Sequence, residues 1–295
     1  MHTRVLVFAL AILGLAGHAF SQTNSPAGNL HSLWRAEGKS NVVYLMGSVH
    51  LLKPSDYPLD PVLELAYTNS TIVVFETDIE RMQRPTTQFE MMSKAALPPG
   101  ETLKDQLSEK VYQDFRKRVE AAGLPGMMFD QLKPSLAAMT LAVVELQKLG
   151  VDPELGIDQH FFNRARKDRK PIVPLETVEF QIDLITGFSK AEGEDFMKSL
   201  LEQIDQTEKV FDEMVSAWKT GNTEMLEKVL NESMRDAPGI YSKFLTDRNR
   251  RWLPEVQKLI DSGTNSVVIV GAGHLVGPDG LVDLLQKRGA KLKQL

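Results

Sequence analysis

The sequence predicts an α/β (α+β) fold, with a central sheet built from a duplicated strand–Gly-x-x-His unit and large helical insertions. Two apolar runs, 41–46 and 265–270, each end at a glycine and deliver a histidine three residues later. Two shorter apolar runs, 71–75 and 171–175, each end in a glutamate. Segments with helical spacing of apolar residues lie between these runs, and this alternation is typical of α/β proteins.

The individual elements follow from local patterns. Residues 33–37 and 42–46, joined by a polar turn, predict a β-hairpin. Asp60 and Pro61 predict the start of a helix over 61–69, because they suit its cap and its first turn. Apolar spacing predicts helices at 108–122, 130–149, 156–167, 177–187, 190–219, 222–235, 237–261 and 281–288, with a core strand at 266–270 and an edge strand at 290–295.

The first residues have the three-part pattern of a secretory signal peptide. A short basic start precedes about a dozen apolar residues, and Ala19 and Ser21 fit a cleavage site. We therefore expect a signal peptide over 1–21, export across the inner membrane, and a periplasmic protein. An uncleaved N-terminal anchor is the alternative. A disordered lead-in over 22–30 and a single domain over 31–295, with a helical insertion at about 177–262, complete the expected organisation.

Composition excludes several classes of function. The chain has no cysteine, which rules out disulfides, thiol catalysis and cysteine-rich zinc sites. Its net charge of −5 argues against nucleic acid as a partner, because binding the phosphate backbone needs a basic face. No run after the first 21 residues approaches the ~20 apolar residues of a membrane span, so no stable span is expected once the signal is removed. The pattern leaves the oligomeric state open.

The matched histidines are the strongest candidates for function. Gly47-Ser-Val-His50 and Gly271-Ala-Gly-His274 each follow a predicted strand. We expect Gly47 and Gly271 to adopt backbone angles closed to other residues, and thereby to hold each histidine at the end of its strand. Imidazole is the commonest metal ligand and a frequent acid–base group. A purely structural role remains the alternative for each histidine.

Two glutamates and one arginine are further candidate site residues. Glu76 and Glu176 follow the two short strands, and parallel strands would bring them to the same sheet edge as the histidines. Two imidazoles with a carboxylate suit a divalent ion such as Zn, Mn or Co. Capping a helix or pairing with an arginine is the alternative for Glu176. Arg248 is expected to face a carboxylate, unless it belongs to a charged helical face, and His160 is expected to be structural.

The motifs in this order resemble the TraB/GumN family. They are Gly47–His50, Val74–Glu76, Gly156–Asp158, Pro174–Gln181, Asp247–Asn249 and Gly271–His274. That family is similar to the Tiki metalloproteases and, more distantly, to ChaN-like haem-binding proteins and erythromycin esterases. The resemblance implies an active centre of His50, His274 and Glu76, with Glu176, Arg248, Asn249 and Asp158 as supporting positions.

These observations predict an exported, divalent-metal-dependent hydrolase that acts on a peptide or small molecule, with a peptidase as the leading hypothesis. His50, His274 and Glu76 would bind the metal, Glu176 would assist as a base, and Arg248 would position a substrate carboxylate or stabilise an oxyanion. A non-catalytic periplasmic protein that binds a metal, haem or a peptide is the main alternative. A third hypothesis is an interaction protein for export or polysaccharide assembly that has a vestigial site.

Overall fold

The computed structural model describes residues 30–295. The predicted signal peptide and all but the last residue of the predicted lead-in lie outside the described residues. None of the helices over residues 30–295 combines the length and the apolar composition that a membrane span requires. The description therefore begins just before the first strand.

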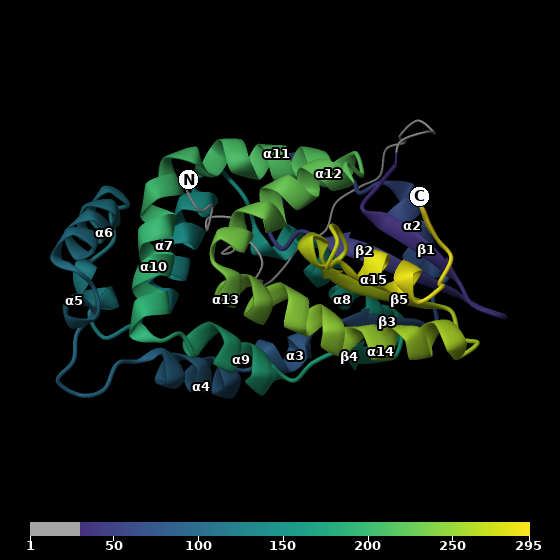
Figure 1. Ribbon diagram of the computed structural model, residues 1–295, viewed down its shortest axis with the longest axis horizontal. Coiled ribbons are helices and arrows are strands. Elements are labelled where there is room, and N and C mark those ends of the chain that lie inside the picture. The colour runs from purple at the N-terminus through teal and green to yellow at the C-terminus, as the bar shows by residue number, and fades with distance from the viewer. Residues whose placement is uncertain (1–29) are drawn as a thin grey trace.

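The fold contains a six-stranded mixed sheet, which confirms the predicted α/β class. Figure 1 shows the strands in the right-hand part of the molecule, with α6, α7 and α10 to their left. Strands β2, β3, β4 and β5 are mutually parallel, while β1 runs antiparallel to β2 and to β6. The order across the sheet is β4-β3-β5-β2-β1-β6. The bounds are β1 Leu33–Glu37, β2 Val42–Ser48, β3 Ile72–Phe75, β4 Ile172–Pro174, β5 Ser266–Gly271 and β6 Leu292–Gln294.

The strand register brings the ends of the predicted strands together. Ser48 pairs with Gly271, and Phe75 pairs with both Ile269 and Pro174. The side chains of β2 and β5 are almost entirely buried, as expected for central parallel strands covered on both faces. Because the strands end level with one another, the residues that follow them meet at one edge of the sheet.

The predicted hairpin is confirmed, and a side chain ties it to the C-terminal part of the chain. Asn41, in the turn between β1 and β2, donates Nδ2 hydrogen bonds to the carbonyls of Leu259 and Thr264, both at 2.9 Å. Asn265 Oδ1 accepts from the Val42 N–H at 2.9 Å. These bonds align β2 with β5 before either strand reaches the site.

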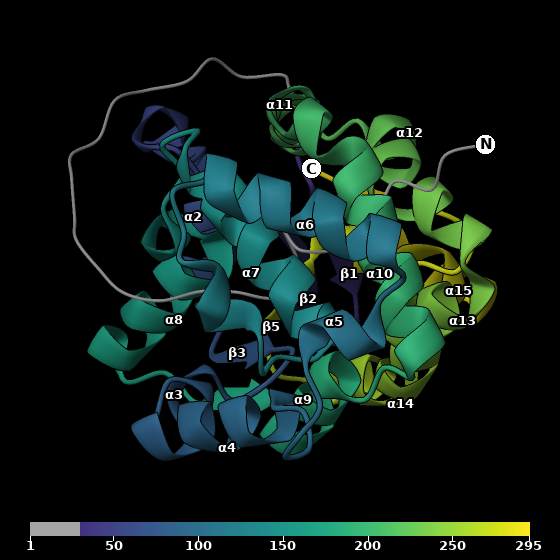
Figure 2. The same cartoon turned by 90° about the vertical axis from the view of Figure 1, so that its left-hand side faces the viewer.

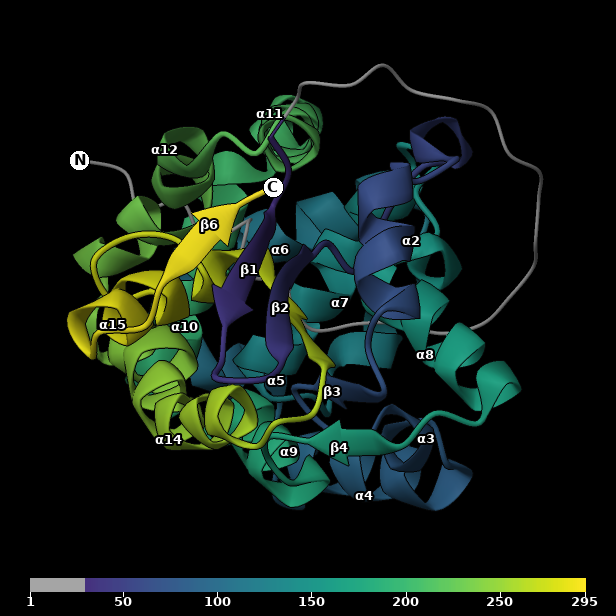
Figure 3. The ribbon, with the colours of Figure 1, turned by 90° about the vertical axis from the view of Figure 1, so that its right-hand side faces the viewer.

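Helices cover both faces of the sheet. Figure 3 shows α2 and α8 on one side of the strands and α14 and α15 on the other. Asp60 caps α2, accepting from the Val62 N–H at 2.9 Å, and Pro61 occupies the first turn as predicted. The bounds are α2 Pro61–Thr68, α8 Ile157–Asp168, α14 Asp247–Asp261 and α15 Leu281–Lys287.

A helical layer lies beyond the carboxyl ends of the parallel strands (Figures 1 and 2). The segment predicted as a single helix over 190–219 is two helices, α10 and α11, separated by a 3₁₀ turn at Ile204–Gln206. The layer comprises α6 Glu109–Ala121, α7 Pro134–Gln147, α9 Val178–Thr186, α10 Lys190–Gln203, α11 Thr207–Lys219, α12 Thr223–Leu226 and α13 Pro238–Tyr241.

Two features of the helical region were not predicted. The sequence pattern assigned nothing to 79–106, which contains α3 Ile79–Met82, α4 Pro85–Ala95 and α5 Leu103–Gln106. Two π-helical segments, η5 Glu227–Asn231 and η7 Ser242–Thr246, also interrupt the α-helical stretches. Segments of this kind occur often at functional sites, because the wider turn redirects side chains.

Candidate active site

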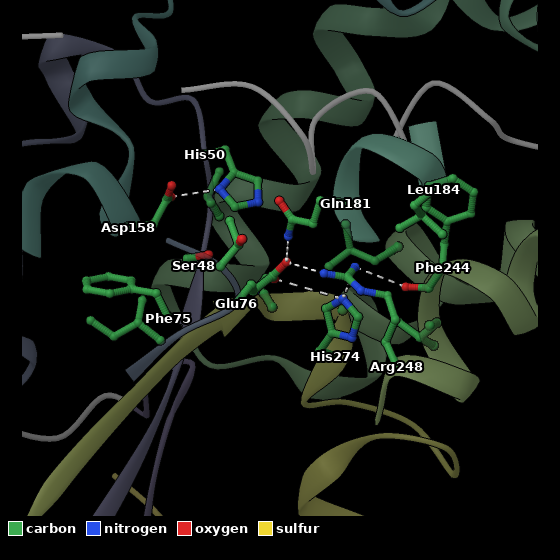
Figure 4. Close-up of a pocket in the computed structure, with 18 of the residues that line it drawn as sticks. Ser48, His50, Phe75, Glu76, Asp158, Gln181, Leu184, Phe244, Arg248 and His274 are labelled. Atoms are coloured by element: carbon green, nitrogen blue, oxygen red, sulfur yellow. Dashed lines mark hydrogen bonds and ion pairs between the residues drawn. The ribbon is translucent and has the colours of Figure 1, made fainter. Parts of the chain in front are cut away.

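His50, Glu76 and His274 converge at the carboxyl edge of the sheet (Figure 4). They follow β2, β3 and β5, three neighbouring parallel strands. The convergence point lies beside Gly271. A Cβ atom on this residue would stand 3.4 Å from Glu76 Oε1, 3.6 Å from His274 Cδ2 and 4.0 Å from His50 Nε2. The histidines, more than two hundred residues apart in sequence, therefore share one site.

The glycines act by leaving space, and the backbone angles predicted for them are wrong. Neither Gly47 nor Gly271 has a positive φ. A Cβ on Gly47 would lie 2.2 Å from Ser32 Oγ and 3.1 Å from the Ala272 Cβ. Gly47 is therefore required for the close approach of β2 to the turn after β5, and Gly271 leaves the space onto which the site residues point.

Asp158 orients His50 from the first turn of α8. Its Oδ1 lies 2.7 Å from His50 Nδ1. Burial alone lowers the pKa of His50, but Asp158, with a smaller effect of Glu76, reverses this and raises the pKa to about 9. The other ring nitrogen, Nε2, is buried and has no hydrogen-bond partner. His50 thus presents one unpaired nitrogen to the convergence point.

Arg248 forms ion pairs with both glutamates of the site. Its Nη2 donates to Glu76 Oε2 at 2.5 Å and to Glu176 Oε1 at 2.6 Å, while Nε donates to Glu176 Oε2 at 3.2 Å. Its side chain is 7% exposed, so the two ion pairs are shielded from solvent. Arg248 therefore faces carboxylates as predicted, and both of these carboxylates belong to the protein itself.

His274 is held as a neutral ring of defined tautomer. Arg248 Nη1 lies 3.0 Å from His274 Nε2, and because a guanidinium can only donate, Nε2 must accept. The proton is then on Nδ1, which donates to Asn249 Oδ1 at 2.7 Å. Burial, together with the positive Arg248, lowers the pKa of His274 to about 3. The 3.9 Å separation between His274 Nε2 and Glu76 Oε1 is therefore not an ion pair.

The two glutamates have opposite pKa shifts. Burial tends to raise the pKa of Glu76, but Arg248, the charged His50 and the Gly271 N–H, which donates to Oε1 at 2.7 Å, lower it to about 2. For Glu176, burial dominates over Arg248 and raises the pKa. Glu76 is therefore a permanent carboxylate, and Glu176 is the carboxyl of the two more easily protonated. Opposed shifts of this kind are common where acid–base work is divided between two groups.

The residues fit part of a metal site. His50 Nε2 is unpaired and Glu76 is ionised, and both border the space beside Gly271. His274, the third predicted ligand, has its Nε2 engaged by Arg248. Within residues 30–295, no three His, Cys, Asp or Glu side chains are grouped as ligands of one ion. A divalent ion would thus be held by His50 and Glu76, with His274 added if Arg248 released it.

The structure places the predicted residues in one cluster and adds others. Asn249 fixes His274 and is itself fixed by its Nδ2 bond to the Asp279 carbonyl at 2.8 Å. His160 lies apart from the cluster, with Nε2 3.0 Å from Glu64 Oε1. The predicted site residues did not include Ser48, Thr77, Gln181, Asn231 or Trp252, which contact the charged cluster or line the adjoining cavity. Ser48 and Gln181 lie within the motifs Gly47–His50 and Pro174–Gln181, and Thr77 follows Glu76, which was the available signal.

Comparison with known proteins identifies the family of the chain. The model of the TraB/PrgY/gumN family matches residues 32–294. Similar proteins include the uncharacterized protein YbaP of Escherichia coli K12 and that of Shigella flexneri. Each is 25% identical over 243 residues, which cover 82% of this chain and 87% of the relative. No solved structure matches. Because the family match spans nearly every described residue, the chain belongs to the TraB/PrgY/gumN family.

Proposed function

We propose that the protein is an exported, divalent-metal-dependent hydrolase, and that its substrate is a peptide. The observation that carries the proposal is the convergence of His50, Glu76 and His274 on the space beside Gly271, with His50 Nε2 unpaired. A buried, unpaired imidazole nitrogen next to an ionised carboxylate suits metal binding, in which the ion displaces the proton that the raised pKa of His50 keeps on the ring.

The residues divide the work as follows. When bound, a divalent ion supplies Lewis acidity and lowers the pKa of its water. His50 and Glu76 would hold the ion, and Asp158 would keep the His50 ring in place, as carboxylates commonly do for ligating histidines. Glu176, with its raised pKa, would accept a proton from the attacking water and return it to the leaving amine. Arg248 would stabilise negative charge that develops on the substrate carbonyl oxygen.

The arrangement also supports a second candidate, a non-catalytic binding protein for a metal, haem or a peptide. Its support is the saturation of Arg248, which already contacts Glu76, Glu176 and His274. A guanidinium fully engaged by the protein has less capacity to follow charge that appears during a reaction. A binding protein would retain the ligand without converting it, and a haem ligand would give a Soret band.

Metal content and peptide turnover test the proposal together. We expect the purified protein to retain one divalent ion per chain, measured by elemental analysis, and to cleave members of a peptide library. The variant His50→Ala should lose both properties while keeping its circular dichroism spectrum. His160→Ala is the matched control, because His160 contacts Glu64 away from the site. Unchanged metal content in His50→Ala would contradict the proposal, and binding without cleavage would favour the second candidate.

A further inference from the structure

A cavity of about 150 Å³ adjoins the charged cluster and is lined by both charged and apolar side chains. His50, Glu76 and Arg248 are among the charged ones. The apolar lining, called the apolar wall below, includes Leu184, Ile185, Met214, Leu230, Met234 and Phe244. The cavity as a whole has the volume that accommodates a ring of the size of benzene, which corresponds to one bulky side chain.

Asn231 lies on the wall of this cavity, at the end of the π-helical segment η5. Its side chain is completely buried. The amide nitrogen, Nδ2, donates to Glu227 Oε2 at 2.8 Å, to the Gly273 carbonyl at 2.9 Å and to the Val276 carbonyl at 3.3 Å. Three acceptors around one nitrogen fix the orientation of the amide, because a flipped amide would set its oxygen against them.

The fixed orientation leaves Asn231 Oδ1 without a hydrogen-bond partner. This oxygen would lie 2.9 Å from a Cβ on Gly273, the residue just before His274. It is therefore a buried acceptor beside Gly273, in the turn that carries His274. Since buried polar groups are almost always paired, an acceptor on a cavity wall points to a ligand that supplies a donor. The hydroxyls of Ser48 and Thr77, which also line the cavity, are likewise buried and unpaired.

We propose that Asn231 and the apolar wall form one substrate subsite, which binds a bulky apolar side chain and the amide N–H next to it. The apolar wall takes the side chain, and Asn231 Oδ1 accepts from the N–H. Asn231 donates to the carbonyl of Gly273, the residue that directly precedes His274. An amide bound by Asn231 therefore lies close to His274 and the other charged groups. This inference rests on the proposed function and specifies its substrate, a peptide with a large apolar residue next to the cleaved bond.

Binding of small probe compounds tests the subsite without requiring turnover. The reference probe is N-acetyl-phenylalanine N-methylamide, and its glycine counterpart lacks the side chain. Two further probes each remove one N–H, by an ester in place of the C-terminal amide or by N-methylation of the acetamide. With a chelator present, we expect the phenylalanine probe to bind at least tenfold more tightly than the glycine probe. One of the two N–H replacements should weaken binding about tenfold, since an acceptor left unpaired is costly.

Two variants separate the parts of the subsite. Asn231→Ala should abolish the difference between the amide probe and its weaker-binding analogue. Leu230→Ala, which enlarges the apolar wall next to Asn231, should shift the preference from the phenylalanine probe to a tryptophan probe. Leu201→Ala is the matched control, because this half-buried leucine on α10 is not part of the cavity. If Asn231→Ala fails to fold, the shift in Leu230→Ala decides the question.

The outcomes distinguish this inference from the proposed function. Equal binding of the phenylalanine and glycine probes, or equal binding of both N–H replacements and the amide, would overturn the subsite. The wild type and His50→Ala could both bind the probes as expected while no peptide is cleaved. That result would support the subsite and contradict the hydrolase. Cleavage without preference for a bulky apolar residue would leave the hydrolase and remove the subsite.

Discussion

Replacing Arg248 by methionine provides the sharpest test of the charged cluster. Methionine fills a similar volume of hydrocarbon but leaves Glu76 and Glu176 buried without their shared partner. Removing one member of a buried ion pair costs about 3–5 kcal/mol, because the remaining charge loses both its solvation and its partner. We therefore expect Arg248→Met to destabilise the protein strongly at neutral pH.

The structure gives a magnitude for this loss. Arg248 is the main group that lowers the pKa of Glu76 from 4.5 to about 2 against the opposing effect of burial. The net shift corresponds to about 3 kcal/mol in favour of the ionised carboxylate, and Arg248 makes the largest favourable contribution to it. Glu176 makes two further bonds to the same guanidinium, at 2.6 and 3.2 Å. The expected decrease in the free energy of unfolding is therefore about 3–5 kcal/mol.

Urea denaturation followed by circular dichroism, at pH 7.5 with a chelator, measures the effect. Arg250→Met is the matched control, because the Arg250 side chain is 67% exposed on the same helix, and it should change stability by less than about 0.5 kcal/mol. The double variant Arg248→Met/Glu176→Gln should be less destabilised than Arg248→Met alone, since one unpaired charge is removed. A loss below about 1 kcal/mol, or no relief from the second substitution, would refute the reasoning.

Three other predictions concern pH, packing and export. The raised pKa of His50 adds stability below pH 6.5 that is lost as the pH rises through about 9, so urea titrations with a chelator should show an alkaline decrease in the wild type and a smaller one in Asp158→Asn, and equal decreases would contradict the assignment. Gly47→Ala should lower stability by about 1–3 kcal/mol in the same assay because of its contact with Ser32, and Ser32→Gly should restore part of the loss. Cell fractionation should find the full chain in the periplasm and a chain without residues 1–21 in the cytoplasm; equal distribution of the two would argue against a signal peptide.

The convergence of His50, Glu76 and His274 could be predicted from the sequence, because each of these residues follows the end of a predicted strand. Apolar runs that stop at Gly47, Phe75 and Gly271 indicate buried strands, and parallel pairing then fixes where the next residues lie. The same reasoning could not assign partners to Arg248. Its contacts with Glu76 and Glu176 are set by how α14 lies against the sheet, a long-range feature without a local sequence pattern.

Other elements escaped prediction for physical reasons. Asn231 gave no signal, because its role depends on the π-helical turn and on carbonyls more than forty residues away. The four-residue helices α3 and α5 lack enough turns to show a periodicity, and α4 exposes the apolar Phe89 and Met92, which obscures its apolar spacing. The space-making role of Gly47 depends on Ser32 and Ala272, which contact it only in the folded sheet.

The position of β5 constrains how the protein can be built. This strand is supplied by residues 266–271, yet it separates β2 from β3, which are made more than 190 residues earlier. A chain that stops short of residue 266 has nothing to join its two amino-terminal strands and lacks one imidazole. The complete sheet and the candidate site therefore form together, only once residues 266–274 have been synthesised. Such late, distant pairing also favours slow folding.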